Sequence, residues 1–578
     1  MAFSLLHAFG IVLFGMAWLL TAHFMPWTNF HGEALALWGL ALLAWAHLVQ
    51  PAAWARQTPR WAVGWLVLAL VPWLQWLFGV ASYAGDAWVG SLFLCALAVA
   101  VSLGYSWGST PPPAEKLRTA FFGALVLASM LTATIAVLQW LSMDSFLTMW
   151  AVQIKPGTRS LGNLGQPNQA ATLLLMGLAA LAWIYERGLV GGVGLAVGAG
   201  WIAIAVGTTQ SRAGVLGALV AAGFLLAHSH FKGLRLRPLH ILGWLVFLAL
   251  WVMVVQPGLS SLLLMSGPRS FEMGVDGSRM TIWKQMLFGI WHAPWWGYGV
   301  NATPTANAWG ALELPGFYTY THGHSIVLDV LAWFGIPVGI LLTAVAAYWF
   351  VTRMLRVHQP GGIYAMACLL PLLVHSLVEF PYAYGYFWVA GGLCIGLVEA
   401  DSWPTKAWQW PRWGGLVLVA FWTVVGAVMT WEYVQIEEDF RYVRFESLNL
   451  GDTPPEHTPP QVHLLTQLGG MLSAGRQKPV ADMPQAALDN LGDASMRFAF
   501  PILRSRYAQA LWLRGDMAAA TAQLGLIRGM YGETVYLGTL ERMRAEQTNG
   551  VPPLPPVPKL PRKEGAPLVG DLPKTTAP

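Results

Sequence analysis

Residues 119–141 read TAFFGALVLASMLTATIAVLQWL, a stretch of apolar and small residues without a single Asp, Glu, Lys or Arg. Because an α-helix rises about 1.5 Å per residue, about 20 such residues cross the hydrocarbon core of a bilayer. Comparable runs occur at 4–23, 33–50, 61–80, 88–106, 169–185, 189–207, 212–228, 239–256, 325–351, 363–378, 383–399 and 413–431. The sequence therefore predicts an all-α, polytopic integral membrane protein with about 13 transmembrane helices.

The composition of the whole chain supports the same class of protein. Of its 578 residues, 56% are hydrophobic and only 11% are charged, whereas a soluble protein has roughly a quarter of its residues charged. The 32 tryptophans, many near the ends of apolar runs, are typical of interfacial aromatic belts. Cys95, Cys368 and Cys394 lie inside apolar runs, so we expect small hydrophobic side chains and no disulfide framework. The net charge of +5 is modest, and no basic run suggests nucleic acid.

The basic residues of the loops predict the orientation. The positive-inside rule places the richer set of alternate loops in the cytoplasm, together with the N-terminus. That set holds twelve: Arg56, Arg60, Lys116, Arg118, Arg187, Lys232, Arg235, Arg237, Arg353, Arg356, Lys406 and Arg412. The opposite set holds six: Lys155, Arg159, Arg212, Arg269, Arg279 and Lys284. An odd number of spans then places everything after residue 431 outside, and the first run, without a convincing cleavage site, is expected to be a retained span.

The six outward basic residues concentrate in three of the six outward loops, beside most of the unusual polar motifs of the chain. A positive charge that is kept against the topological bias suggests a function for it. The alternative is an ordinary scattering of loop charges.

Two of the polar motifs lie at the ends of apolar runs. The first, RSLGNLGQPNQ at 159–169, precedes a run, and Pro167 with Asn168 suits a helix start, where free backbone N–H groups favour an anion. The alternative is a capped helix entry. The second, TTQSRAG at 208–214, places Arg212 at the outer junction of two runs. A charge so close to hydrocarbon should face a polar cavity or extend to the lipid headgroups.

The main outward loop covers about 257–324. It contains GSRMTIWK at 277–284, whose spacing supports an amphipathic interfacial helix, and YTHGHS at 320–325 at the next membrane entry. The HxH pattern of His322 and His324 could hold a metal, but no cysteine lies nearby and carboxylates are few, so we predict none. A histidine there is otherwise a plausible acid/base group near neutral pH.

The last motif is HSLVEFPY at 375–382, at the outer end of its run. Glu379 is one of very few acids at membrane depth. Its carboxylate could pair with an arginine, orient a histidine or bind an acceptor.

Together these motifs resemble the bacterial O-antigen ligase and polymerase superfamily, most closely its PglL-type protein O-oligosaccharyltransferase branch. The residues that carry the resemblance are Gly162-Asn163-Leu164-Gly165-Gln166-Pro167-Asn168-Gln169, Ser211-Arg212-Ala213-Gly214, Arg279 with Trp283 and then Pro294 with Gly297-Tyr298-Gly299, His324-Ser325 with Leu328 and Gly335, and His375 to Pro381. They span residues 159–381, and the hydropathy pattern extends the likeness across the membrane part. The family commonly has His-Asn where this chain has His324-Ser325, and an acid where it has Trp333.

The resemblance implies a GT-C-like glycosyltransferase of the bacterial inner membrane that uses no metal or other cofactor. Such an enzyme moves an oligosaccharide from undecaprenyl pyrophosphate onto an acceptor at the periplasmic face. The acceptor is a Ser or Thr of a periplasmic protein, such as a pilin, in the PglL-like branch. It is lipid A core for the ligases and a growing chain for the polymerases. A polyprenyl-glycan transporter is a further alternative, but it would require ionisable groups along a path through the spans.

The resemblance and the charge pattern together give expected roles. Arg212 and Arg279 would stabilise the pyrophosphate, because guanidinium groups grip phosphate bidentately and keep their charge. His324 would take the acceptor proton, although His322 lies only two residues away and the choice between them stays open. Supporting substrate contacts are expected from Lys155, Arg159, Gln166, Asn168, Lys284, Tyr320 and His322. Acceptor or structural support is expected from His375 and Glu379.

After residue 431 the apolar runs stop. Residues 432–550 are expected to form a helical periplasmic domain, and 507–524 resemble a tetratricopeptide-like hairpin around Gly515. This domain either recognises the acceptor or only caps the membrane domain, 1–431. The stretch 551–578 contains nine prolines, which predicts a disordered tail.

Overall fold

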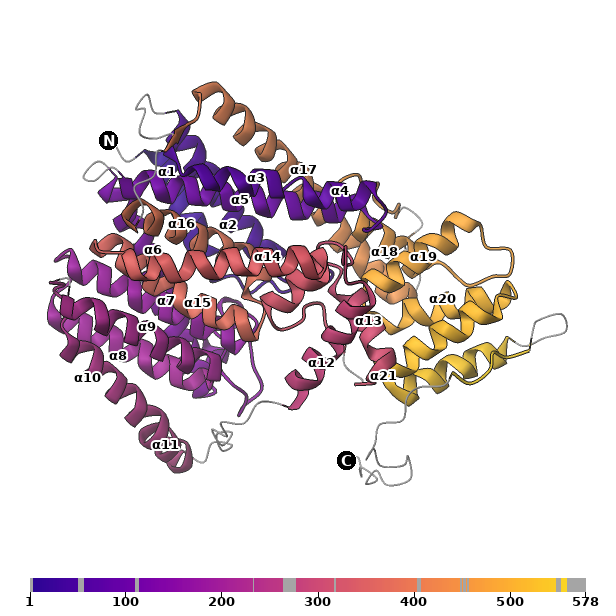
Figure 1. Cartoon of the computed structure of the whole chain (residues 1–578). Helices are drawn as coiled ribbons and strands as arrows, with labels where there is room; N and C mark the ends of the chain where they lie inside the picture. The colour runs from indigo at the N-terminus through magenta and orange to yellow at the C-terminus, as the bar shows by residue number, and fades with distance from the viewer. Residues whose placement is uncertain are drawn as a thin grey trace. The chain divides into compact units, whose positions relative to one another are not determined.

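The computed structural model describes residues 4–49, 57–109, 114–231, 233–263, 277–316, 319–402, 407–447, 450, 454, 457–546 and 553–558. Regular structure in this part is almost entirely helical, as Figure 1 shows. The exceptions are β1 (Gln57–Thr58) and β2 (Trp408–Gln409), which pair antiparallel over two residues each. The predicted all-α class is confirmed.

The chain divides into two compact units. The first unit comprises Met1–Leu74, Ala87–Gly274 and Thr343–Glu437, and the second comprises Gln75–Asp86, Val275–Leu342 and Glu438–Pro578. Helices wholly within the first unit are α1 (Leu5–Met16), α2 (Phe30–Leu48), η2 (Arg60–Ala62), α3 (Val63–Leu68), α6 (Glu115–Trp140), η3 (Asp144–Trp150), α7 (Pro167–Glu186), α8 (Gly192–Thr209), α9 (Arg212–Phe231), α10 (Pro238–Leu250), η4 (Trp251–Val255), α11 (Gln256–Leu262), α15 (Pro360–Val378), η5 (Pro381–Ala383) and α16 (Gly385–Ser402). Those within the second are α12 (Gly277–His292), α13 (Thr303–Glu313), α18 (Thr466–Arg476), α19 (Gln485–Arg497), α20 (Pro501–Leu513) and α21 (Met517–Ala545). The unit boundaries fall inside α4 (Val71–Leu77), α5 (Ala84–Ser109), α14 (Ile326–Arg356) and α17 (Arg412–Ser447).

Each predicted apolar run contains helical residues, although some runs are divided among two or three consecutive helices. Ten helical segments of the described chain are long and apolar enough to cross a membrane: Arg60–Leu77, Ala84–Ser109, Glu115–Trp140, Pro167–Glu186, Gly192–Thr209, Arg212–Ser229, Pro238–Leu262, Ile326–Arg356, Pro360–Val378 and Arg412–Glu446. The other three predicted runs correspond to α1, α2 and α16, which do not meet both criteria. The protein is therefore a multi-pass membrane protein.

Small residues allow the helices of the first unit to approach closely. A Cβ atom on Gly104 of α5 would lie 2.1 Å from the Leu393 carbonyl oxygen of α16, and one on Gly396 would lie 2.2 Å from the Val101 oxygen. Such contacts are typical of packing between membrane helices, where close backbone approach replaces the hydrophobic driving force. Larger side chains at either glycine would separate α5 from α16.

A buried ion pair joins α14 to α16 in the first unit. Arg353 donates from Nε to Glu399 Oε2 at 2.7 Å and from Nη2 to Oε1 at 3.1 Å. Trp349 donates to the same carboxylate from Nε1 at 3.1 Å. Because Glu399 is fully buried, this fork-to-fork pair compensates two charges that would otherwise be costly.

The second unit contains the helices of the main loop and the C-terminal helices α18 to α21. Figure 1 shows α18 to α21 as one group of helices. Ala308 and Ala311 of α13 share an apolar cluster with Leu526 and Met530 of α21. Helices α20 and α21 pack on each other across a turn in which Gly515 has φ +82°.

The ends of two predicted segments differ from their expected extents. Helix α17 continues to Ser447, well past the predicted boundary at residue 431. Of the proline-rich stretch from 551, residues 553–558 lie against the C-terminal helices. Trp512 donates from Nε1 to the Pro553 oxygen at 3.0 Å, and Arg528 donates from Nη1 to the Pro558 oxygen at 3.3 Å. The rest of the predicted tail lies outside the described residues.

Candidate active site

The predicted site residues belong to both units, and each unit is considered separately. The first unit holds Lys155, Arg159, Gln166, Asn168, Arg212, His375 and Glu379. The second unit holds Arg279, Lys284, Tyr320, His322 and His324. Arg269, another of the outward basic residues, lies outside the described residues.

The turn that precedes α7 is held by a buried glutamine. Gln139, near the end of α6, donates from Nε2 to the Gly162 oxygen at 2.8 Å. Its Oε1 accepts from the backbone N–H groups of Leu161 at 3.0 Å and Gly162 at 2.9 Å. Gly162 has φ +61°, a left-handed conformation that glycine adopts without steric cost. The turn is thus fixed by its own backbone and by α6.

The side chain of Asn163 connects the same turn to two other segments by hydrogen bonds. Its Oδ1 accepts from the Val152 N–H at 3.0 Å. Its Nδ2 donates to the Leu19 oxygen at 2.8 Å and to the Trp150 oxygen at 2.9 Å. The first half of the motif therefore has a structural role, since these bonds use the asparagine side chain within the protein.

Asn168 connects three segments of the first unit. It lies in the first turn of α7, and its Oδ1 accepts from Ser211 Oγ at 2.7 Å and from Arg159 Nη2 at 3.0 Å. Its Nδ2 donates to Glu379 Oε1 at 3.1 Å. One buried amide thus links a guanidinium group to a carboxylate that belongs to another predicted motif.

The neighbours of this amide are fixed in turn. Arg159 also donates from Nε to the Thr209 oxygen at 2.8 Å. Thr172, one turn after Asn168, lies 2.8 Å through its Oγ1 from His375 Nδ1. The structure therefore brings together Arg159, Asn168 and Glu379 directly and places His375 one residue further along the same network.

The remaining candidates of the first unit lie closer to solvent. Arg212 is exposed and is the first residue of α9, where the free N–H groups of a helix start add positive potential. Lys155 is exposed on the segment before the turn. Gln166 is the N-cap residue of α7, and its Oε1 accepts from Gln169 Nε2 at 3.5 Å.

In the second unit, a buried carboxylate fixes the turn that contains His324. Asp329 Oδ1 accepts from the Gly323 N–H at 2.8 Å and from Thr303 Oγ1 at 2.8 Å. Trp333 donates from Nε1 to Thr303 Oγ1 at 2.9 Å. Asp329 is fully buried, and the turn holds His324 at φ +52°, a conformation that surrounding contacts must impose on a non-glycine residue.

Sequence reasoning missed Asp329. The available signal was an acid in the first turn of an apolar helix, five residues after His324. Trp333, which stands where the related family commonly has an acid, belongs to the same chain of hydrogen bonds through its indole N–H.

Helix α12 carries the second predicted arginine. Trp283 donates from Nε1 to the His324 oxygen at 3.2 Å, so this side of α12 contacts the histidine turn. Arg279 precedes Trp283 by four residues, and side chains four apart lie on the same side of a helix. Arg279 is half-buried and Lys284 is exposed.

Tyr320 and His322 flank this turn. The Tyr320 ring lies 6.5 Å from the His324 ring, and its buried hydroxyl has no hydrogen-bond partner among the described residues. Burial raises the pKa of Tyr320, which keeps the hydroxyl protonated. For His322, burial among protein atoms and then the charges of Arg497 and His324 lower the pKa to about 3. His322 is consequently a weak base at neutral pH, which favours His324 for proton transfer.

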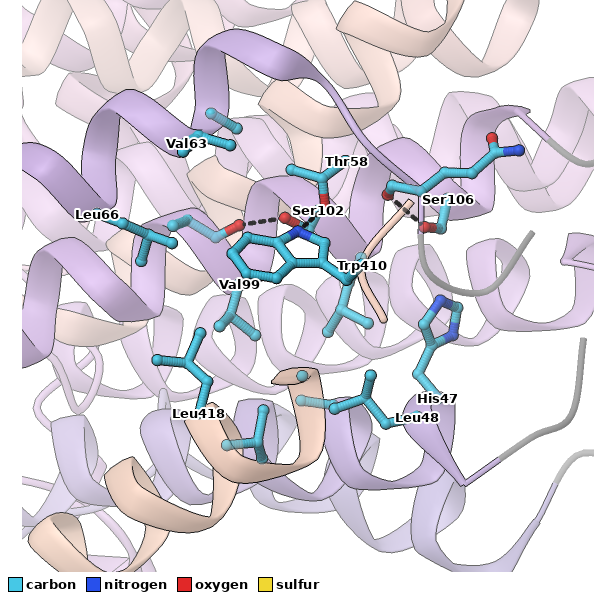
Figure 2. A pocket seen from close by; sticks show the side chains of 17 residues that line it. His47, Leu48, Thr58, Val63, Leu66, Val99, Ser102, Ser106, Trp410 and Leu418 are labelled. Carbon is cyan, nitrogen blue, oxygen red and sulfur yellow. Dashed lines mark hydrogen bonds between the residues drawn. The ribbon is translucent and has the colours of Figure 1, made fainter. Parts of the chain in front are cut away.

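Two further features concern metal ligation and a pocket of the first unit, each within the described part of the chain. No group of three or more His, Cys, Asp or Glu side chains that could hold a metal ion occurs among the described residues. Figure 2 shows a pocket of the first unit, where Trp410 donates to Thr58 Oγ1 at 3.0 Å. Its lining is mostly apolar and includes none of the predicted site residues.

Comparisons with known proteins find partial matches to three family models and two curated relatives. Three family models match parts of the chain: "O-Antigen ligase" at residues 195–343, "Virulence factor membrane-bound polymerase, C-terminal" at 363–538, and "Protein glycosylation ligase" at 161–185. The General O-oligosaccharyltransferase of Acinetobacter baylyi is 26% identical over 551 residues, which cover 92% of this chain and 94% of the relative. The ComP-specific O-oligosaccharyltransferase of the same organism is 25% identical over 260 residues, which cover 42% and 44%.

The fold and these matches define a polytopic membrane glycosyltransferase. The chain resembles the O-antigen ligase and polymerase superfamily, and within it the protein O-oligosaccharyltransferase branch.

Proposed function

We propose that this protein transfers an oligosaccharide from undecaprenyl pyrophosphate to Ser or Thr hydroxyls of a periplasmic protein, such as a pilin. The reaction takes place at the periplasmic face of the bacterial inner membrane, with the N-terminus in the cytoplasm. The observation that carries the proposal is the arrangement in the second unit. There the turn of His324 is fixed by Asp329, and α12 contacts it on the side that carries Arg279.

The chemistry requires a base and a site for an anionic leaving group. The acceptor hydroxyl oxygen attacks the anomeric carbon, and the bond from that carbon to the pyrophosphate oxygen breaks. His324 takes the hydroxyl proton, a contribution of about 10²–10⁴-fold in comparable enzymes. Undecaprenyl pyrophosphate leaves with the electron pair, and its growing negative charge is stabilised by fixed guanidinium groups.

Arg279 and Arg212 are the proposed pyrophosphate ligands. Arg279 is half-buried, which strengthens its field, and Arg212 combines its charge with a helix start. Lys155, Lys284 and Gln166 are proposed as supporting contacts. Because arginine supplies the positive charge, the proposed reaction needs no metal ion.

Arg159 is proposed to act mainly by positioning neighbouring groups of the site. Its bonds to Asn168 and Thr209 hold the guanidinium in one place. Glu379, held through the same amide, is proposed to support the acceptor side of the reaction.

A second candidate function is that of an O-antigen ligase or polymerase. The "O-Antigen ligase" and "Virulence factor membrane-bound polymerase, C-terminal" models match much longer stretches than the "Protein glycosylation ligase" model. In that case the acceptor would be lipid A core or a growing glycan chain, and the same base and arginines would act on the same donor.

Reconstitution distinguishes these acceptors. The purified protein in liposomes receives undecaprenyl-pyrophosphate-linked glycan together with a candidate acceptor protein and lipid A core, with and without EDTA. We expect mass spectrometry to find the glycan on Ser or Thr peptides, at equal yield with EDTA and at a much lower yield with Arg279→Gln. Glycan on lipid A core alone, or lipid-linked glycan lengthened into a polymer, would favour the second candidate. No transfer from this donor to protein, lipid A core or a growing glycan chain would contradict both candidates.

A further inference from the structure

One side of α12 presents a large apolar surface outside the protein core. We define the α12 outer face as Met280, Leu287, Phe288 and Trp291 of the helix together with Trp295 and Trp296 of the following turn. Trp291, Trp295 and Trp296 are 75%, 69% and 77% exposed. Indole rings are among the largest apolar side chains, so three of them at such exposure need an apolar environment.

The opposite side of α12 is packed within the second unit. Ile282, Met286 and Ile290 lie in an apolar cluster with Ala306 and Tyr320. The buried and exposed positions repeat with helical periodicity, so α12 carries apolar residues both on its buried side and on its exposed side. The outer face is therefore not a face that the core of the second unit covers.

The turn after α12 is tied to a helix that is apolar and long enough to cross a membrane. Tyr298 donates from its N–H to the Ala332 oxygen of α14 at 2.8 Å, and Ile336 of α14 donates to the Pro294 oxygen at 2.7 Å. Trp295 and Trp296 lie between these bonded positions. Helix α14 is one of the ten candidate spans, so these two hydrogen bonds connect the outer face to a helix that is apolar and long enough to cross a bilayer.

The charges of α12 suit a lipid surface as well. Between Gly277 and His292 the helix carries Arg279 and Lys284 and no acidic residue. Lys284 is exposed beside the outer face, where the aliphatic part of its side chain can lie on apolar surface.

We propose that the α12 outer face docks in the interface of the lipid bilayer, with its three tryptophans at the level of the lipid headgroups. The consequence for catalysis rests on the proposed function. Arg279 and Trp283 lie on another side of the same two turns, and Trp283 holds the His324 oxygen. A helix embedded in the interface therefore sets the height of Arg279 and His324 to that of the headgroups, where a lipid-linked pyrophosphate lies.

Site-directed spin labelling tests the docking without any assay of transfer. A nitroxide at Trp295→Cys is placed in protein reconstituted in phosphatidylethanolamine–phosphatidylglycerol vesicles, and a matched label is placed at Leu537→Cys of α21, which is 46% exposed. We expect the first label to relax faster with lipid-soluble oxygen than with aqueous nickel, and the second to show the reverse. Equal preference for aqueous nickel at both positions would overturn the proposal.

Transfer kinetics test the consequence. In Trp291→Gln/Trp295→Gln/Trp296→Gln, the apparent KM for undecaprenyl-linked donor in vesicles is expected to rise about tenfold, because interfacial anchoring by aromatic side chains is lost. The kcat/KM for a short-chain, water-soluble donor is expected to stay within about twofold. Equal loss with both donors, or no loss with either, would overturn the link to catalysis. Failure of the wild type with every donor would refute the proposed function, while the spin-label result would still decide the docking.

Discussion

Asp329 offers the most direct test of how the histidine turn is held. Asp329→Ala removes a fully buried carboxylate that accepts from the Gly323 N–H and from Thr303 Oγ1, both at 2.8 Å. A hydrogen bond to a charged group contributes about 1.5–3 kcal/mol. The two bonds therefore predict a local loss of about 3–6 kcal/mol.

Asp329→Asn separates charge from geometry. Both bonds end on Oδ1, so the amide oxygen can still accept them. Neutral hydrogen bonds contribute about 0.5–1.5 kcal/mol each, which predicts about half the loss of the alanine variant. Glu438→Gln is the matched control, because its exposed pair with Arg441 at 3.0 Å contributes at most about 1 kcal/mol.

Hydrogen–deuterium exchange of peptides that cover 319–330 measures the local opening free energy, and the glycan transfer rate is followed in parallel. We expect protection to fall in the order wild type, Asp329→Asn, Asp329→Ala, with the transfer rate in the same order. Wild-type protection and wild-type transfer in Asp329→Ala would refute the assignment of the turn to this carboxylate.

Three further predictions concern other polar groups. Asn168→Ala is expected to lower both the midpoint of thermal unfolding by circular dichroism and the transfer rate, because it removes the hydrogen bonds of Asn168 with Arg159, Ser211 and Glu379; an unchanged midpoint would contradict this. Arg353→Met is expected to lower the free energy of unfolding by about 3–5 kcal/mol, because Glu399 stays buried without its cation. The double variant Arg353→Met/Glu399→Leu is expected to recover most of this loss in the same thermal unfolding experiment. The pKa of His322 is about 3 in the folded chain against 6.5, so the unfolded state alone binds a proton as pH falls below about 6.5. The free energy of unfolding should therefore decline as the pH falls below about 6.5, and it should decline less steeply in His322→Gln than in the wild type. Parallel pH profiles of the two proteins would contradict the lowered pKa of His322.

The membrane helices could be predicted from the sequence because apolar length decides them. The run 119–141 became α6, Glu115–Trp140. The ends of segments were harder to predict. Helix α1 stops at Met16 although apolar residues continue to position 23, because hydropathy does not report where a backbone leaves the helix. Helix α17 passes residue 431 because its later turns bury Tyr433 and Ile436 between charged residues.

Some residues of the candidate site could also be predicted from the sequence, whereas others could not. The motifs named Asn168 and Glu379, and the structure joins them by one hydrogen bond across 211 residues of sequence. Gln139 and Asp329 were missed, because each is a single polar residue within an apolar segment. Their importance depends on the distant backbone groups that they bond, and spacing along the chain does not reveal those groups.

The central claim is that His324 takes the proton of the acceptor hydroxyl. Its most direct test is the single-turnover transfer rate in vesicles for His324→Asn beside His322→Gln. Asparagine tolerates the left-handed backbone conformation of position 324, so the turn is preserved while the base is removed. We predict that His324→Asn slows transfer by about 100-fold or more, whereas His322→Gln stays within about threefold of the wild type. A wild-type rate in His324→Asn would contradict the claim.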